Sequence, residues 1–260
     1  MDKNKQIFNY LNQDQLRNIV LLKMLATNDQ GVEMQYVENG RSAGVLMILP
    51  SHHFSYDAQT YPDKDLIVII SADSPGVIEE MIPYLPQDKD LVFKLFTEDA
   101  FDALSAHFEL ERQRSFISFS CQPDAQFSKQ PDVSVLYELD DRILPYFVEN
   151  GYTEKEVRQW FAHQQAIGFA IWQGEMAKSV GMAYQNYGNI WEIGGLHTVH
   201  SARRGGNAQK IVETSLNILL AEGKVPRYQI HEANIASRYL AEKVGLRPFL
   251  VTEHYLYRGK

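Results

Sequence analysis

The chain has 260 residues, of which 45% are hydrophobic and 22% are charged, a composition ordinary for a globular protein with room for one large or two modest cores. Its formal net charge of −8 argues against a nucleic-acid-binding surface. Cys121 is the single cysteine, which excludes an internal disulfide framework and a metal site made of several cysteines. We therefore expect neither a metal nor a nucleic acid as partner.

The start of the chain shows no targeting or membrane signal. Its first residues lack the basic-then-apolar order of a signal peptide. The best apolar run nearby, Ile19 to Ala26, is short and is interrupted by Lys23. These features predict a cytoplasmic protein without a membrane span.

Helical and strand patterns alternate through the first half of the chain. The Asn-Gly pair in Glu38-Asn39-Gly40 is typical of a hairpin turn. Hydrophobic periodicity predicts helices over Lys3–Leu11, Gln15–Ala26, Ser74–Tyr84 and Glu98–His107, and strands over Leu66–Ser71, Leu91–Phe96 and Arg114–Cys121.

Residues 121–131 form a polar segment with two prolines and no hydrophobic period, which is typical of a linker. The parts on either side have about 130 residues each, an ordinary single-domain size. We therefore predict two domains, over residues 1–125 and 131–260.

The second half predicts a mixed α/β order that begins with a strand over Val133–Tyr137 and a helical stretch over Asp140–His163, broken near Gly151. The elements that follow are strands over Gly168–Gln173, over Ser179–Tyr187 and from Ile190, a helix ending at Gly223, a strand over Pro226–Glu232, a helix from Asn234 to Gly245 and a strand over Phe249–Tyr257.

The segment Arg203-Arg204-Gly205-Gly206-Asn207-Ala208 lies between the strand from Ile190 and the helix that ends at Gly223. A strand that leads through a glycine-rich turn into a helix N-terminus presents backbone amides and the positive end of the helix dipole to one point, which favours a phosphate or pyrophosphate. The absence of Gly-Lys-Ser/Thr excludes a nucleotide P-loop, and the dinucleotide fingerprint needs three spaced glycines. A tight turn without a ligand is the alternative.

Arg203-x-x-Gly206-x-Ala208 resembles the pyrophosphate loop of the GCN5-related N-acetyltransferases, the GNAT superfamily. A second signature of that family resembles Asn234-Ile235-Ala236-Ser237, which opens a helix that runs to Gly245-Leu246. The resemblance implies the GNAT acyl-CoA N-acyltransferase fold for the second half, a splayed mixed sheet flanked by helices, with acetyl-CoA as co-substrate. The element order of the first half suggests a degenerate, non-catalytic copy, with an unrelated α+β domain as the alternative.

The resemblance also implies which residues hold the coenzyme. Backbone amides of the loop would hold the pyrophosphate, the amide and carbonyl of Val199 would pair with the pantetheine arm, and an amide near Leu196–Val199 would stabilise the oxyanion. Gly194-Gly195 predicts a bulge that opens this strand. The residues assigned to the coenzyme are Thr198, Val199, Arg203, Arg204, Gly205, Gly206, Asn207, Ala208, Asn234 and Ser237.

Glu192 is the candidate general base, at the position where histone-acetylating relatives in this family carry a glutamate. A strand position between Trp191 and Ile193 would partly remove it from water; a surface or salt-bridged carboxylate at a strand end is the alternative. His197 and Glu232 are further candidates for catalysis, because they lie on the two strands expected to flank the thioester.

The chain departs from the family pattern at the general acid. Many members carry a tyrosine seven residues after the asparagine, where this chain has Ala241. Tyr239 lies two residues earlier, which turns a helix by roughly 200°, so we predict that it faces the other way as a packing residue. The missing acid weakens the expectation of strong turnover.

The sequence thus predicts an N-acetyltransferase that transfers acetyl to a primary amine of a small molecule by direct attack. A non-catalytic acyl-CoA-binding or sensing module is the alternative, and a site for another anion is a weaker one. The acceptor, the acyl chain length and the oligomeric state, with a homodimer conceivable, stay open.

Overall fold

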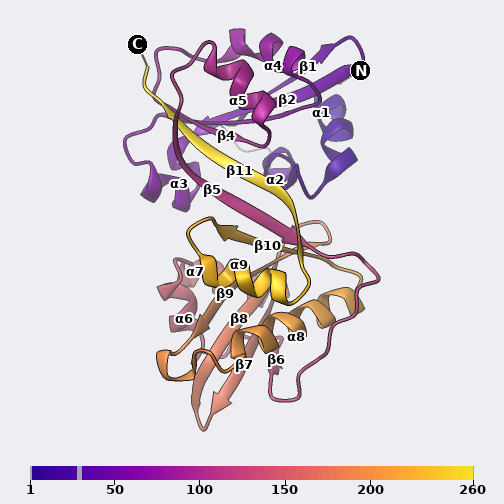
Figure 1. Cartoon of the computed structure of the whole chain (residues 1–260), viewed down its shortest axis with the longest axis vertical. Helices are drawn as coiled ribbons and strands as arrows, with labels where there is room; N and C mark the ends of the chain where they lie inside the picture. Colours follow the sequence, from indigo (N-terminus) through magenta and orange to yellow (C-terminus); the bar gives the residue numbers. More distant parts are fainter. Residues whose placement is uncertain (1, 28–30, 260) are drawn as a thin grey trace. The chain divides into compact units, whose positions relative to one another are not determined.

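The structure is a computed structural model that describes residues 2–27 and 31–259 (Figure 1). The chain divides into two compact units. Unit 1 comprises Met1–Ile117 with Leu250–Lys260, and unit 2 comprises Ser118–Phe249. The predicted domains, 1–125 and 131–260, differ from these units chiefly at the C-terminus, because the last strand belongs to unit 1.

Unit 1 is a mixed sheet with the strand order β1-β2-β3-β4-β11-β5. β3 and β4 are parallel, and β11 is antiparallel to β4 from Glu253 opposite Leu95 to Tyr257 opposite Leu91. The strands are β1 (Glu33–Asn39), β2 (Ser42–Pro50), β3 (Leu66–Ala72), β4 (Leu91–Leu95), β5 (Glu111–Ser120) and β11 (Arg247–Tyr257), of which β5 and β11 lie partly in unit 1.

The helices of unit 1 are α1 (Lys3–Leu11), α2 (Ile19–Thr27), α3 (Ser55–Thr60), α4 (Pro75–Met81) and α5 (Glu98–Ser105). α4 and α5 cover one face of the sheet, where Val77, Met81 and Leu104 pack on Val68 and Phe93 (Figure 1). The predicted helix over Gln15–Ala26 begins only at Ile19. The preceding residues turn instead, because the Asp14 carboxylate accepts the Arg17 amide and the Asn18 side chain donates to the Leu11 carbonyl.

Unit 2 contains the strand order β10-β9-β8-β7-β6 and confirms the elements predicted for the second half. Its strands are β6 (Ser134–Leu136), β7 (Ala166–Gln173), β8 (Met176–Tyr187), β9 (Ile190–Thr198) and β10 (Val225–His231). Its helices are α6 (Leu144–Glu149), α7 (Glu154–Ala162), α8 (Asn207–Ala221) and α9 (Ile235–Lys243). The predicted break near Gly151 is confirmed: Gly151 has φ +91° and Thr153 opens α7 with a capping box.

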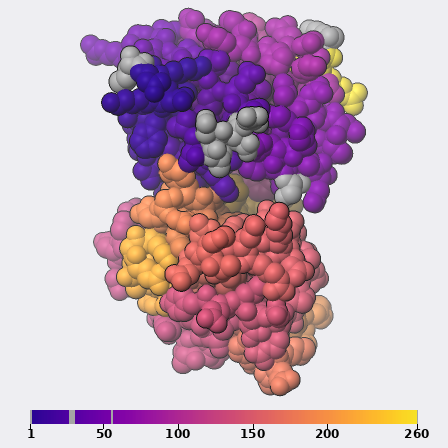
Figure 2. Space-filling view, turned by 180° about the vertical axis from the view of Figure 1, so that it is seen from behind, coloured from indigo at the N-terminus to yellow at the C-terminus, as the bar shows by residue number. Residues whose placement is uncertain are grey.

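Helices cover both faces of this sheet. Val180 and Met182 of β8 pack into the cluster that α6 and α7 supply, while Gly181 between them lies against Ile211 of α8. Successive strand residues point to opposite faces, so α8 lies on the face opposite α6 and α7. In Figure 2, earlier segments of unit 2 (rose) and later segments (orange) lie next to each other on the face that is shown.

The sheet of unit 2 is open between β9 and β10. These parallel strands pair only from Ile190 opposite Val225 to Glu192 opposite Arg227. Beyond that point β9 continues to Thr198 and β10 continues to His231, but the two strands no longer pair with each other. The unpaired strand edges leave backbone groups available to a ligand between them.

Among the described residues, no helix is long and apolar enough to cross a membrane.

Candidate functional site

The loop before α8 bends sharply at two residues with left-handed backbone, Arg204 at φ +64° and Gly206 at φ +75°. Gly206 is the N-cap of α8, and the Asn207 side chain donates to the Ala202 carbonyl at 2.8 Å. The first helical bond that reaches back to the cap runs from the Lys210 amide to the Gly206 carbonyl. The amides of the first turn therefore have no intrahelical acceptor and point out of the helix end.

A cavity of about 560 Å³ opens at this helix end, and we call it the loop cavity. Its lining includes Leu196 and Thr198 of β9 as well as a set of loop and helix residues. Those residues are Ala202, Arg203, Arg204, Gly206, Asn207, Ala208 and Gln209, with Ala236, Ser237, Tyr239, Leu240 and Lys243 from α9. Three cationic side chains and a helix N-terminus at one cavity suit a ligand that carries several phosphates.

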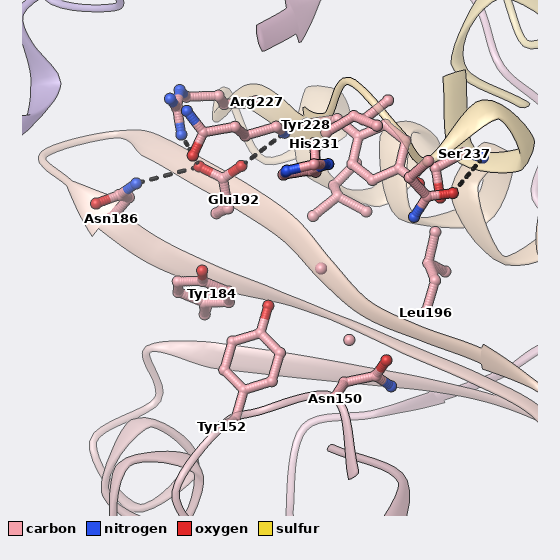
Figure 3. Close-up of a pocket in the computed structure, with 16 residues that line it drawn as sticks. Asn150, Tyr152, Tyr184, Asn186, Glu192, Leu196, Arg227, Tyr228, His231 and Ser237 are labelled. Atoms are coloured by element: carbon pink, nitrogen blue, oxygen red, sulfur yellow. Dashed lines mark hydrogen bonds and ion pairs between the residues drawn. The ribbon is translucent and has the colours of Figure 1, made fainter. Parts of the chain in front are cut away.

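A second cavity of about 360 Å³ lies where β9 and β10 separate, and we call it the polar cavity (Figure 3). Tyr152 and Tyr184 point into it from one side, and Tyr228 and His231 of β10 line the other side. Leu196 and Ser237 line both cavities, so the two cavities meet at these residues.

Glu192 lies in the polar cavity but is also one half of a buried ion pair. Its Oε2 accepts from Arg227 Nη1 at 2.5 Å and from Asn186 Nδ2 at 3.1 Å, and its Oε1 accepts from the Gln229 amide at 3.0 Å (Figure 3). The side chains of Glu192 and Arg227 are 7% and 5% exposed. Glu192 is thus the salt-bridged carboxylate that was the alternative to a free base.

The polar cavity has an aromatic wall that the sequence did not predict. Tyr184 stacks on Trp160 with ring centroids 4.4 Å apart, and Tyr152 contacts both rings edge-on. Burial raises the pKa of Tyr152 to about 12, although the neighbouring Tyr184 hydroxyl and Gly195 amide act to lower it. Burial, with Tyr152 and Glu192 nearby, also holds the pKa of Tyr184 well above its ordinary value.

The predicted bulge at Gly194-Gly195 is confirmed. The β8–β9 register shifts between Val180 opposite His197 and Met182 opposite Gly194, so β9 carries an extra residue there. Gly195 has φ +62°, and a Cβ on it would lie 2.8 Å from Phe147. A Cβ on Gly194 would displace the Tyr152 hydroxyl, so glycine at 194 lets that hydroxyl approach β9.

The structure corrects the predicted role of Val199. Its amide donates to the Lys178 carbonyl at 3.0 Å and is therefore not available to a ligand, while its carbonyl already accepts from the Ala202 amide at 2.9 Å. Bonding alternates along an antiparallel pair, so Thr198 turns its backbone away from β8. The Thr198 carbonyl accepts from Arg203 Nε at 3.1 Å, which shows that it faces the loop.

His197 and Glu232 do not line either cavity. The His197 ring lies 4.9 Å from the ring of Tyr146, and its Nδ1 is 3.8 Å from Glu149 on α6. Glu232 follows β10 and is half-buried. Gly205 also lies outside both linings, whereas Asn234 lines the polar cavity and caps α9 by accepting the Ser237 amide at 3.0 Å.

The interpretation of Tyr239 as a packing residue is wrong. Tyr239 is 65% exposed and lines the loop cavity, while Ala241 is fully buried. The two residues do face different ways, but the core side of α9 is the side of Ala241. Position 241, where many family members carry the tyrosine, is therefore buried in this chain.

The corresponding turn of unit 1, between β3 and α4, holds a carboxylate. Asp73 Oδ1 accepts from the Tyr10 hydroxyl at 2.9 Å, and Asp73 Oδ2 accepts from the Ala43 amide at 3.0 Å. A fixed negative charge before a helix N-terminus disfavours an anionic ligand there.

Comparisons with known proteins give a structural answer only. No protein-family profile and no curated protein matches the sequence. Among solved structures, a GCN5-related N-acetyltransferase from Sphaerobacter thermophilus superposes with a TM-score of 0.59 at 9% identity, over 94% of this chain and 92% of that one. A GCN5-related N-acetyltransferase-like protein from Streptococcus suis gives 0.54 at 13% identity, over 99% and 100%.

A tandem GNAT protein from the clavulanic acid biosynthesis pathway matches with a TM-score of 0.55 at 10% identity, over 100% of this chain and 96% of that one. The predicted fold class is confirmed by these matches, which cover unit 1 as well as unit 2. The chain has the fold of the GCN5-related N-acetyltransferases, and its full length aligns with a tandem protein of that kind.

Proposed function

We propose that the protein is an acetyl-CoA-dependent N-acetyltransferase that acts on a primary amine of a small molecule. The observation that carries this proposal is the junction of the two cavities at Leu196 and Ser237. One cavity suits a phosphate-bearing donor, and the other offers polar groups to an acceptor, so the reacting atoms would meet at the junction. The acetyltransferases among the structural neighbours support the same reading.

On the donor side, the pyrophosphate of coenzyme A would lie on the first-turn amides of α8, next to Arg203 and Arg204. Lys243 of α9, which also lines the loop cavity, would add a further cation. The pantetheine arm would run along β9 and replace Arg203 as the partner of the Thr198 carbonyl. The open β9 edge then acts as a strand template for the arm.

On the acceptor side, Glu192 is the one carboxylate among the residues that line the polar cavity. A carboxylate offers about four lone-pair positions, and three donors already occupy Glu192. The remaining position would accept from the ammonium of the substrate or from a water that carries its proton away. A cationic small molecule also fits the net charge of −8.

Direct attack of the amine on the thioester requires no covalent enzyme intermediate. Cys121 lines neither cavity, and burial raises its pKa to about 11, so it is a thiol rather than a nucleophilic thiolate at neutral pH. The amine and the thioester, held at one junction, would react without the entropic barrier of a bimolecular encounter.

The test is the thermal shift produced by acetyl-CoA in the parent, in Gly206→Asp and in Gly206→Asn. Both substitutions place a side chain at φ +75°, where a Cβ meets nothing within 4 Å, so they share the same backbone strain. Only Asp adds a charge that repels pyrophosphate. At about one hundred times its dissociation constant, a ligand stabilises the folded state by about 2.7 kcal/mol.

We expect the shift in the parent, a large part of it in Gly206→Asn and none in Gly206→Asp. A parent that shows no shift at millimolar acetyl-CoA contradicts the proposal. Equal shifts in all three proteins would move the coenzyme away from the loop.

A non-catalytic acyl-CoA-binding module is the second candidate, favoured by the buried Ala241 at the family's acid position. Release of coenzyme A thiol in the presence of amino sugars, polyamines and other small amines distinguishes the two. Binding without thiol release above the uncatalysed rate would support the module.

We also propose that unit 1 is a degenerate copy that does not bind the coenzyme. The Asp73 carboxylate, held by Tyr10 and Ala43, supports this because it occupies the turn that corresponds to the pyrophosphate loop.

A further inference from the structure

We propose that Tyr228 is the acid that protonates the departing coenzyme A thiolate, and that Ser237 positions its hydroxyl. This inference rests on the proposed acetyltransferase function. Many family members carry a tyrosine as general acid at the position of Ala241, and alanine has no hydroxyl. The inference therefore assigns the proton donor to another residue of this chain.

Tyr228 lies on β10 directly after Arg227, the last residue that pairs with β9. Its side chain is therefore at the point where the two strands separate. The ring is 4% exposed, lines the polar cavity and extends toward Ser237 (Figure 3). The Ser237 side chain lies near enough to the Tyr228 phenol to act on its pKa.

Ser237 fixes the place of this hydroxyl pair. It lies in the first turn of α9, where its amide donates to the Asn234 side chain at 3.0 Å. It is also one of the two residues that line both cavities. A thioester that links a donor in the loop cavity to an acceptor in the polar cavity must pass this junction, so its sulfur would come within reach of the pair.

The protonation state suits an acid. Burial raises the pKa of Tyr228 above its ordinary value, and the nearby Glu192 carboxylate acts in the same direction. The phenol therefore keeps its proton through neutral pH and can give it to a thiolate. The Ser237 side chain opposes the rise and would stabilise the phenolate that forms on transfer.

The other hydroxyls and the imidazole near the junction are engaged elsewhere. Tyr184 donates to Tyr152, whose oxygen also receives the Gly195 amide. The Nδ1 of His231 accepts the Ala233 amide at 3.1 Å. Tyr239 is 65% exposed and belongs to the loop cavity alone.

The nitrogen lone pair of the amine forms a bond to the carbonyl carbon, and the carbon–sulfur bond breaks with its electron pair on sulfur. Sulfur takes the phenolic proton of Tyr228. The nitrogen becomes cationic when it attacks and then loses a proton through water to the phenolate, so amine and thioester become amide and thiol without a further reactant.

The experiment compares the parent with Tyr228→Phe, Ser237→Ala and a control, Tyr137→Phe, using the most reactive amine of the panel. Tyr137 is 55% exposed and lines neither cavity. We expect kcat to fall by about 10²-fold in Tyr228→Phe, by less in Ser237→Ala and not at all in the control. The dissociation constant of acetyl-CoA should change little.

A second donor, the acetyl selenoester analogue of acetyl-CoA, separates proton transfer from a structural effect. A selenol is more acidic than a thiol and needs no acid to leave. We expect Tyr228→Phe to recover most of the parental kcat with this donor.

A deficit in Tyr228→Phe that is equal for both donors, or a kcat within about twofold of the parent for both, would overturn the assignment. Failure of the proposed function is distinguishable, since the parent itself would then release no thiol with any amine.

Discussion

Glu192 and Arg227 lie opposite each other where β9 and β10 still pair. The Arg227 guanidinium also donates from Nη2 to Ser118 at 3.0 Å, while its Nε is buried without a partner among the described residues. An ion pair with so little contact to water depends on both members being present, because either one alone is a buried charge.

We expect Glu192→Gln to lower the free energy of unfolding by about 3 kcal/mol, since it leaves the Arg227 charge without its carboxylate. Urea denaturation measures this. The double variant Glu192→Gln with Arg227→Gln should recover much of the loss, because no charge remains buried. A double variant that loses more unfolding free energy than the two single variants lose together would contradict this account.

Tyr152 gives a pH dependence of known sign. Its pKa is about 12 in the folded protein against 10.0 for the ordinary side chain, so the folded state holds the proton to higher pH than the unfolded state. Its contribution is fully present below about pH 10 and is lost as pH rises toward 12. Unfolding free energies between pH 9 and 11 should fall less steeply in Tyr152→Phe, and identical slopes would contradict the assignment.

Residue-level prediction from the sequence had a clear limit at this pair. Glu192 was found from its spacing before Arg203, but its partner was not, because Arg227 meets it only through the parallel register of two strands far apart in the sequence. Hydrophobic periods define which residues form strands and contain no information about the register between two strands joined by a long connection. The same reason applies to Tyr228 on β10, whereas Tyr152 lies between α6 and α7, where no hydrophobic period shows which side chains meet the sheet.

At the scale of elements, the bulge in β9 follows shortly after Glu192, the last residue that pairs with β10. Gly195→Ala should destabilise the protein by the strain of φ +62° and by about 1–3 kcal/mol of overpacking against Phe147. Gly188→Ala is the matched control: its φ is +54° and a Cβ there meets nothing within 4 Å. The difference between the two variants in the free energy of unfolding, measured by urea denaturation, gives the packing contribution. A difference near zero would show that Phe147 moves to make room for the added methyl group.

Helices and strands were predictable because their patterns are local. Capping at Thr153, the glycine at position 151 and the Asn-Gly hairpin each have a short-range physical cause that the sequence shows. The face of α9 was not predictable in the same way. An angle of roughly 200° separates Tyr239 from Ala241 on a helix, but which of them meets the core is decided by the sheet that α9 packs on.

For the whole molecule, the C-terminal strand was assigned to the wrong unit. The alternating pattern over Phe249–Tyr257 predicted a strand correctly, and its partner is β4 of unit 1. Residues 250–257 therefore complete a sheet whose other strands come from the first half of the chain. Long-range pairing of this kind has no local signal, so a boundary drawn at a single linker could not include it.

This connectivity predicts where a C-terminal substitution acts. Tyr257 is 2% exposed, contacts Phe108 at a centroid distance of 5.0 Å and donates to the Gln87 carbonyl at 3.0 Å, all within unit 1. Tyr257→Ala should therefore lower the stability of unit 1 by about 3–5 kcal/mol. Tyr84→Ala, at a tyrosine of the same unit that is 53% exposed, is the matched control and should have little effect.

Hydrogen exchange read by mass spectrometry separates the units. In Tyr257→Ala, amides of β4 should exchange faster, whereas amides of β8 and β9 should keep their protection. The dissociation constant of acetyl-CoA should also stay within about twofold of the parent, because all residues lining the loop cavity belong to unit 2. Equal loss of protection in both units would mean that the chain unfolds as one cooperative body, and the C-terminal strand would then stabilise the candidate site as well.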